Sequence, residues 1–132
     1  MSESVLDASS ILTLLFCKPG HESVMKKLSG AIVSTVSQAE VIAALIDGGA
    51  TIEESRTMIL SLPFEFVSFS PEEAVIAARY RSMNGFSHLA FEKLASLALA
   101  TSRGLPMVTT SHDLPPEIPG VYVENDRESS HA

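Results

Sequence analysis

Hydrophobic residues along the chain occur in short apolar runs and in longer stretches with helical spacing. The short runs, continuous or alternating and bounded by turn residues, are typical of β-strands. They lie at residues 4–7, 31–34, 64–69, 106–109 and 121–124. Between them, apolar residues three and four positions apart predict helices at residues 10–17, 21–29, 37–46, 51–61, 71–82 and 88–103.

This alternation of strands and helices predicts the class of fold. Strands separated by helices pair in parallel through right-handed crossovers, with helices covering both faces of the sheet. We therefore expect a three-layer α/β/α sandwich with a mainly parallel sheet of four to five strands. Residues 1–126 are expected to form a single domain, and residues 127–132 a solvated tail.

Composition and charge narrow the class of function. Nine Lys and Arg residues against sixteen Asp and Glu residues give the 132-residue chain a net charge of −7. This balance disfavours nonspecific coating of nucleic acid, but permits an enzyme that holds phosphate through a metal ion. The single cysteine, Cys17, is expected to be a buried thiol. No membrane-spanning run or signal peptide is apparent, so we expect a cytoplasmic protein.

Two acidic residues follow strands that parallel pairing would place side by side. Asp7 closes the run at 4–7, and Glu40 lies in the helix that follows the run at 31–34. Ligand sites of open parallel sheets lie outside the carboxyl ends of the strands. Two carboxylates meeting there require a compensating cation or proton. The pair therefore predicts a divalent-metal site.

Other chemistries lack their sequence signals. No phosphate-binding glycine loop, dinucleotide fingerprint or nucleophile-elbow motif is present. His88 and His112 have no spacing typical of zinc ligands. A receiver-like or phosphatase-like α/β domain remains an alternative, although a receiver-like domain would pair acids before its first helix. Arg79, Arg81 and Arg103 are candidates for phosphate contact, with exposed solubilising charge as the more common role.

Several segments, in order, resemble PIN-domain nucleases. They are Val-Leu-Asp-Ala-Ser at 5–9, Ser-Thr-Val-Ser-Gln-Ala-Glu-Val at 34–41, Ala-Ser-Leu-Ala-Leu-Ala at 95–100 and Gly-Leu-Pro-Met-Val-Thr at 104–109. The chain most resembles ribonuclease toxins of the VapC type. The resemblance implies that Asp7 and Glu40 bind Mg²⁺ or Mn²⁺ and that a metal-bound water attacks an RNA phosphodiester. It also implies a homodimer and a cognate antitoxin.

The chain departs from the family pattern at two acidic positions. Counting back from Gly104 places Lys93 at the third acid, and Ser111 stands at the fourth. Glu92 and Asp113 are neighbouring carboxylates that could substitute, as catalytic residues beside Asp7 and Glu40. If Lys93 points into the site, its ammonium can pair with the acids and replace the metal ion. The alternative function is therefore a catalytically inactive PIN-fold protein that binds RNA or a protein.

Each candidate residue also has a structural interpretation. Asp7 could cap the helix that follows it, and Ser37 with Glu40 fits a capping box. Ser9 and Thr109 could orient groups in the site or cap the backbone. On pattern alone, Glu92 belongs to a solvated helix face. Apolar residues 11–16 and the helix at 51–61 are candidate walls of a groove for a partner.

Overall fold

Residues 2–127 are described by a computed structural model. Its sheet has five strands, all paired in parallel, in the order β3-β2-β1-β4-β5. The strands are β1 (Ser4–Leu6), β2 (Ala31–Ser34), β3 (Glu65–Val67), β4 (Met107–Thr109) and β5 (Val123–Asn125). The expected mainly parallel sheet is confirmed. β1 is the central strand, so the residue that follows it emerges at the middle of the carboxyl edge.

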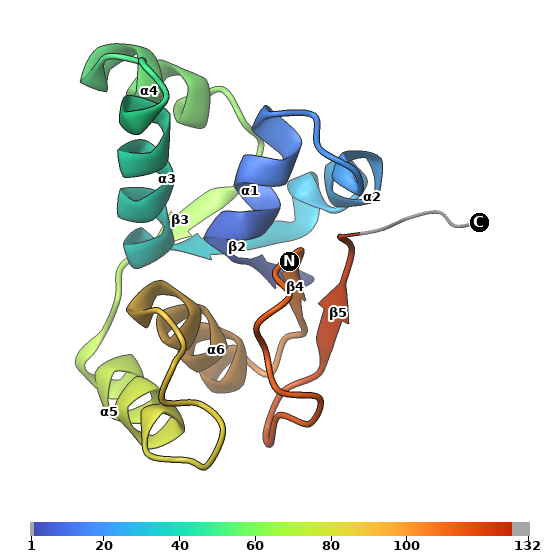
Figure 1. The fold of residues 1–132 in the computed structure, drawn as a ribbon, viewed down its shortest axis with the longest axis vertical. Helices are drawn as coiled ribbons and strands as arrows, with labels where there is room; N and C mark the ends of the chain where they lie inside the picture. The colour runs from blue at the N-terminus through green and yellow to red at the C-terminus, as the bar shows by residue number, and fades with distance from the viewer. Residues whose placement is uncertain (1, 128–132) are drawn as a thin grey trace.

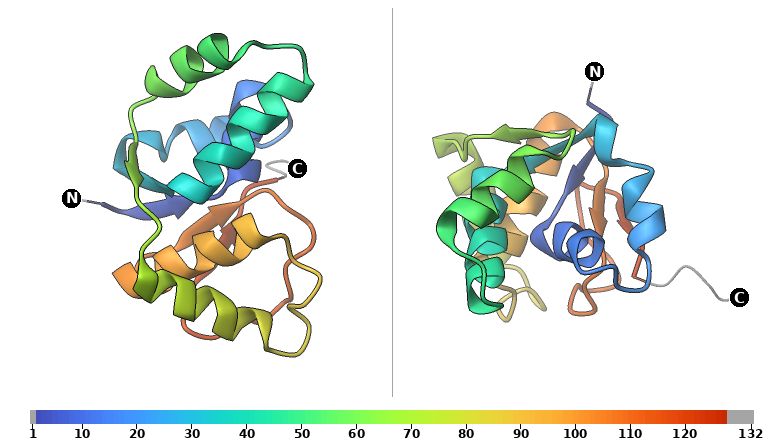
Figure 2. Two further views of the ribbon diagram at one scale, coloured as in Figure 1. Left: turned by 90° about the vertical axis from the view of Figure 1, so that its left-hand side faces the viewer. Right: turned by 90° about the horizontal axis from the view of Figure 1, so that it is seen from above.

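Helices cover both faces of this sheet (Figure 1). They are α1 (Ala8–Leu15), α2 (His21–Met25), α3 (Thr35–Asp47), α4 (Ile52–Leu60), α5 (Pro71–Arg81) and α6 (Phe91–Arg103), with a 3₁₀ turn, η1, at Leu28–Gly30. Figure 2 shows α5 and α6 on one side of the sheet and α1 to α4 on the other. The molecule is thus the three-layer sandwich that the alternating pattern predicts.

Two hydrophobic cores separate the layers. Alternate residues of each strand point to opposite faces, so Val5 packs toward α5 and α6, whereas Leu6 packs toward α1 and α3. Every side chain of α6 from Glu92 to Ala100 is buried. A helix enclosed on this scale places its first turn firmly against the carboxyl edge of the sheet.

Several helix boundaries differ from the sequence prediction for local reasons. α1 begins two residues earlier than expected because Asp7 caps it, its Oδ1 accepting from the Ser10 backbone N–H. α3 also begins two residues earlier, capped by Ser34, so the predicted capping box of Ser37 and Glu40 is wrong. α6 begins three residues later than expected, at Phe91.

Other local features were predicted correctly, and one was not. Thr51 and Glu54 form the expected capping box of α4, and Ser70 caps α5 with Pro71 in its first turn. Cys17 is exposed rather than buried, because α1 ends at Leu15 and Cys17 turns the chain with a φ of 52°. Residues 128–132 of the predicted tail lie outside the described residues. No helix within residues 2–127 is long and apolar enough to cross a bilayer.

Candidate functional site

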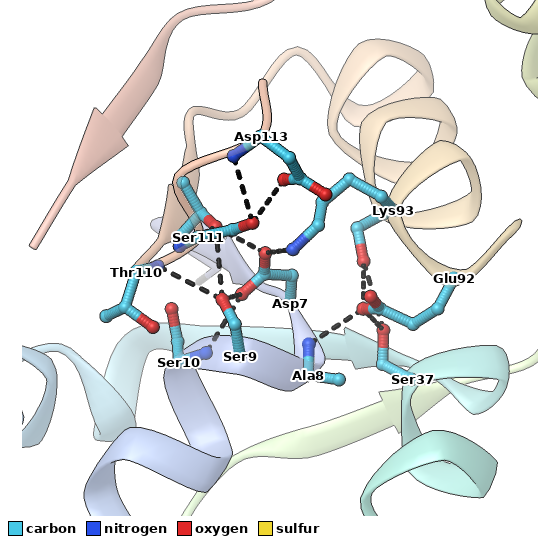
Figure 3. A network of polar contacts seen from close by, with 12 residues as sticks. Asp7, Ala8, Ser9, Ser10, Ser37, Glu92, Lys93, Thr110, Ser111 and Asp113 are labelled. Carbon is cyan, nitrogen blue, oxygen red and sulfur yellow. Dashed lines mark hydrogen bonds and ion pairs between the residues drawn. The ribbon is translucent and has the colours of Figure 1, made fainter. Parts of the chain in front are cut away.

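Asp7 is the centre of a buried polar network at the carboxyl end of β1 (Figure 3). Its Oδ1 accepts hydrogen bonds from the Ser9 hydroxyl at 2.8 Å and from the Ser10 backbone N–H at 3.0 Å. Its Oδ2 accepts from the Thr109 hydroxyl at 2.5 Å. The side chain is fully buried, so these donors replace the water that an exposed carboxylate would bind.

Lys93 forms an ion pair with Asp7. Its Nζ lies 2.6 Å from Asp7 Oδ2, and the exposed fractions of the two side chains are 6% and 0%. Lys93 lies in the first turn of α6, where the helix dipole disfavours a cation. The ion pair with Asp7 offsets both this repulsion and the loss of water around the ammonium. Lys93 therefore has a specific partner and does not lie on a solvated face.

Glu92 is buried beside this pair, which overturns the expectation of a solvated helix face. Its Oε2 accepts hydrogen bonds from the Ala8 backbone N–H at 2.7 Å, the Ser37 hydroxyl at 2.6 Å and the Ser96 hydroxyl at 3.1 Å. The Ala8 N–H belongs to the first turn of α1, whose dipole favours a carboxylate. Glu92 thus connects α1, α3 and α6.

The charges of this cluster shift two pKa values. Burial raises the pKa of Glu92, and the nearby Asp7 carboxylate raises it further, against the opposing effects of Lys93 and the donors Ser37 and Ala8. Burial alone would lower the pKa of Lys93, but Asp7, Glu92 and Asp113 raise it above its ordinary value. Lys93 is therefore an ammonium at neutral pH and cannot act as a base.

The remaining candidate residues lie at different distances from Asp7. Thr109 and Ser9 contact it directly. Ser111 donates its hydroxyl to the Asp113 carboxylate, in the loop that passes above Lys93 (Figure 3). Glu40 is exposed, and no hydrogen bond or ion pair within the described residues joins it to Asp7. It lies three positions after Ser37 and so shares that face of α3.

The candidate groove walls are only partly available. Ile11 and Leu14 are buried in the core under α1, so they cannot line a surface groove. Phe16 at the end of α1, and Ile52 and Leu60 of α4, are exposed. Any partner that uses this side of the molecule therefore meets the end of α1 and the outer face of α4.

Comparison with known proteins decides the family. Residues 4–115 match the PIN domain, which is most of the chain. The chain belongs to the PIN-domain family. Among curated proteins, none matches the sequence.

Several solved structures with the same fold are of toxins or toxin–antitoxin complexes. A toxin–antitoxin complex from Klebsiella pneumoniae superposes with a TM-score of 0.74 and 20% identity, covering 96% of this chain and 99% of that chain. DNA-bound VapBC from Salmonella typhimurium superposes with a TM-score of 0.73 and 20% identity, covering 95% of this chain and 98% of that chain. VapC20 of Mycobacterium tuberculosis is a toxin that cleaves the sarcin–ricin loop. It superposes with a TM-score of 0.66 and 13% identity, covering 84% of this chain and 90% of that chain. At these identities the likeness shows the fold.

The residues of this PIN domain do not fit the magnesium ion that the family resemblance implies. Mg²⁺ needs oxygen atoms with free lone pairs, whereas each oxygen of Asp7 already accepts two hydrogen bonds. An ammonium 2.6 Å from Oδ2 also repels a divalent cation. Within residues 2–127 no three His, Cys, Asp or Glu side chains are grouped to hold a metal ion.

Sequence reasoning missed two contributors to this network, Ser37 and Ser96. Both donate to Glu92, and their hydroxyls lie 3.0 Å apart. One signal was present in the sequence: Glu92 and Ser96 are four residues apart, at the start of a nearly continuous apolar run from Leu94 to Ala100. Polar residues at that spacing lie on one helix face and can share a partner.

Proposed function

We propose that this PIN-domain protein is the toxin-like half of a toxin–antitoxin pair, that it binds a protein partner, and that it does not cleave RNA through a metal ion. One observation carries the proposal: the Lys93 ammonium contacts Asp7 where a nuclease of this fold would need a cation. Lys93 and Ser111 stand at the positions of the third and fourth family acids. The site is therefore degenerate in composition as well as in contacts.

The charges of the cluster favour the site with the Lys93 ammonium paired to Asp7. Asp7 and Glu92 bring two negative charges to the cluster, and Lys93 compensates one of them while hydrogen bonds and the α1 terminus stabilise Glu92. A divalent ion would have to displace the buried Lys93 ammonium from Asp7 and would itself have to lose water to enter the site. The ammonium therefore competes with a metal ion for the same carboxylate.

Protein binding is supported by the fold and by the overall charge. Structures that share the fold include a toxin–antitoxin complex and VapBC bound to DNA. The net charge of −7 suits a basic partner protein better than an RNA backbone. The exposed Phe16, Ile52 and Leu60 give such a partner apolar contacts.

A metal-dependent endoribonuclease is the second candidate function. The observation that favours it is the position of Asp7 at the carboxyl end of the central strand, with Glu92 and Asp113 also acting on Lys93. In this alternative, Lys93 leaves the site, and Glu40, Glu92 or Asp113 completes the ligand set around Mg²⁺ or Mn²⁺. It requires a rearrangement of the first turn of α6.

An RNA-cleavage assay distinguishes the two functions. Structured and single-stranded RNAs would be incubated with the protein and Mg²⁺ or Mn²⁺, beside Asp7→Asn and a chelator control. We expect the same background for the wild type and for Asp7→Asn. Chelator-sensitive cleavage that Asp7→Asn abolishes would overturn the proposal. For the partner, we expect the chain to co-purify with a small DNA-binding protein encoded by the adjacent gene, and failure to do so would contradict that part.

A further inference from the structure

A cavity of about 470 Å³ opens beside the Asp7 network. It lies between α1, the turn that follows α1, and the segments that follow β4 and β5. Ser9 joins it to the network, since this residue lines the cavity and its hydroxyl donates to Asp7. The cavity is separate from the Lys93 contact, because Lys93 does not line it.

The cavity is basic in an acidic protein. Lys18, His112 and Arg127 line it, whereas no carboxylate is among the described residues that do so. The nearby acids are engaged elsewhere: Asp126 pairs with Lys27 at 2.5 Å, and Asp113 accepts from Ser111. In a chain with sixteen acids and nine Lys and Arg residues, such a concentration of positive charge selects an anion.

The floor of the cavity supplies hydroxyl donors. Thr13 Oγ1 and Thr110 Oγ1 lie 2.8 Å apart, and both residues are less than one-tenth exposed. Only one of their two hydroxyl hydrogens is used between them, and within residues 2–127 the other has no acceptor, so it can donate to a ligand. Lys18 and Arg127 line the same cavity, and the Lys18 ammonium, 5.8 Å from the centroid of the Phe16 ring, has no carboxylate partner within residues 2–127. Hydroxyl, guanidinium and ammonium donors suit the oxygens of a phosphate group.

The position of Arg127 is supported by the surrounding structure. The Asp126 carboxylate is held by Lys27, and its backbone N–H donates to the Thr109 carbonyl at 2.8 Å. The Arg127 backbone N–H donates to Asn125 Oδ1 at 2.9 Å. These contacts hold the segment after β5 against β4 and Lys27, and Gly20, in the turn that carries Lys18, lies against the Asp126 carbonyl.

A second cavity of about 390 Å³ adjoins the first and shares His112 and Arg127 with it. Its walls include Pro115, Pro116 and Tyr122, whose rings present apolar faces. Tyr122 is 70% exposed and lacks a stacking partner among the described aromatic pairs. A flat group stacked here would lie beside the basic cavity.

We infer that the two cavities form one site for a nucleotide, with the phosphate between Lys18 and Arg127 and the base against Tyr122. A nucleotide is the class of ligand that joins a phosphate to a flat, weakly polar ring. The inference goes beyond the proposed function and does not depend on it, since Lys18, Arg127 and Tyr122 take no part in the hydrogen bonds and ion pair of Asp7. The ligand is either a free nucleotide or the phosphorylated end of a nucleic-acid chain.

Calorimetric titration with five ligands tests the site: inorganic phosphate, a nucleoside monophosphate, the same nucleoside, and a short oligonucleotide with and without a 5′-phosphate. We expect the monophosphate to bind at least about tenfold more tightly than the nucleoside, because charge-assisted hydrogen bonds hold its phosphate. Tighter binding of the phosphorylated oligonucleotide than of the monophosphate would support the site and identify a chain end as the source.

Variants assign the two halves of the site. The double variant Lys18→Ala, Arg127→Ala should bind the monophosphate and inorganic phosphate roughly tenfold or more weakly than the wild type, since two cations are lost. Tyr122→Ala should weaken binding of the monophosphate but leave binding of inorganic phosphate unchanged. Lys26→Ala, an exposed cation outside both cavities, is the matched control. The inference is overturned if the double variant binds like the wild type, or if the nucleoside binds as tightly as the monophosphate.

Discussion

Asp7 combines two tasks in one side chain, which explains why its carboxylate is fully bonded. One oxygen caps α1 through the Ser10 N–H, and the other accepts from Lys93 and Thr109. The sequence indicated both tasks as separate possibilities, and the structure shows that they coexist. Motif order predicted the place of Asp7 at the end of the first strand, and the sequence also predicted that the Lys93 ammonium can pair with it if it points into the site, as it does.

The burial of Glu92 could not be predicted in the same way. The expected helix began at residue 88, whereas α6 begins at Phe91, which is exposed while Glu92 is buried. The partners that make this burial tolerable come from α1 and α3. The contacts with Ala8 and Ser37 span 84 and 55 positions of the sequence. Contacts over such separations leave no local signal in a single sequence.

The raised pKa of Glu92 predicts a pH dependence of stability. A carboxyl group whose pKa is raised in the folded state stabilises the fold fully below its unfolded pKa, near 4.3, and loses that contribution as pH rises through the folded value. We therefore expect the free energy of unfolding of the wild type, relative to Glu92→Gln, to fall between pH 4 and pH 7. Glutamine keeps an oxygen that can accept from Ala8, Ser37 and Ser96.

Urea denaturation at pH 4, 5.5 and 7 measures this difference. Glu117→Gln is the control for loss of a surface carboxylate, since Glu117 is exposed in the loop between β4 and β5. A difference between wild type and Glu92→Gln that stays constant across these pH values would contradict the electrostatic description of the cluster.

At the scale of elements, the turn between α1 and α2 packs against the segment that follows β5. Gly20 has a φ of 96°, and a Cβ at this position would lie 2.0 Å from the Asp126 carbonyl oxygen. Glycine therefore allows the segment after β5 to cross the turn between α1 and α2. The helix-stop pattern Lys18-Pro19-Gly20 predicted the turn, but not this close approach to a residue more than one hundred positions away.

Gly20→Ala should be clearly more destabilising than Gly49→Ala. Gly49 also has a positive φ, of 110°, but a Cβ there meets nothing within 4 Å. Both variants incur about 1–2 kcal/mol from the left-handed backbone, and steric overlap at Gly20 adds about 1–3 kcal/mol. Chemical denaturation of the two variants measures the difference, and equal losses of stability would show that the crossing contact is not tight.

At the scale of the whole molecule, the class of fold followed from the sequence because each level of pattern agreed. Apolar runs, capping residues and turn residues all indicated alternating strands and helices, and the five parallel strands confirm it. The strand order was not predicted, since it depends on contacts between distant segments. The family could be recognised because its motifs occur in order over residues 4–115.

The central claim is that a resident ammonium replaces the metal ion of this fold, and Mn²⁺ affinity tests it most directly. Titration would compare the wild type with Lys93→Asp and with Lys93→Asp combined with Ser111→Asp, after circular dichroism confirms that each is folded. We predict no binding by the wild type in the micromolar range, and affinity at least about tenfold higher in the double variant, because two carboxylates then join Asp7. Wild-type protein that binds Mn²⁺ as tightly as the double variant would contradict the account.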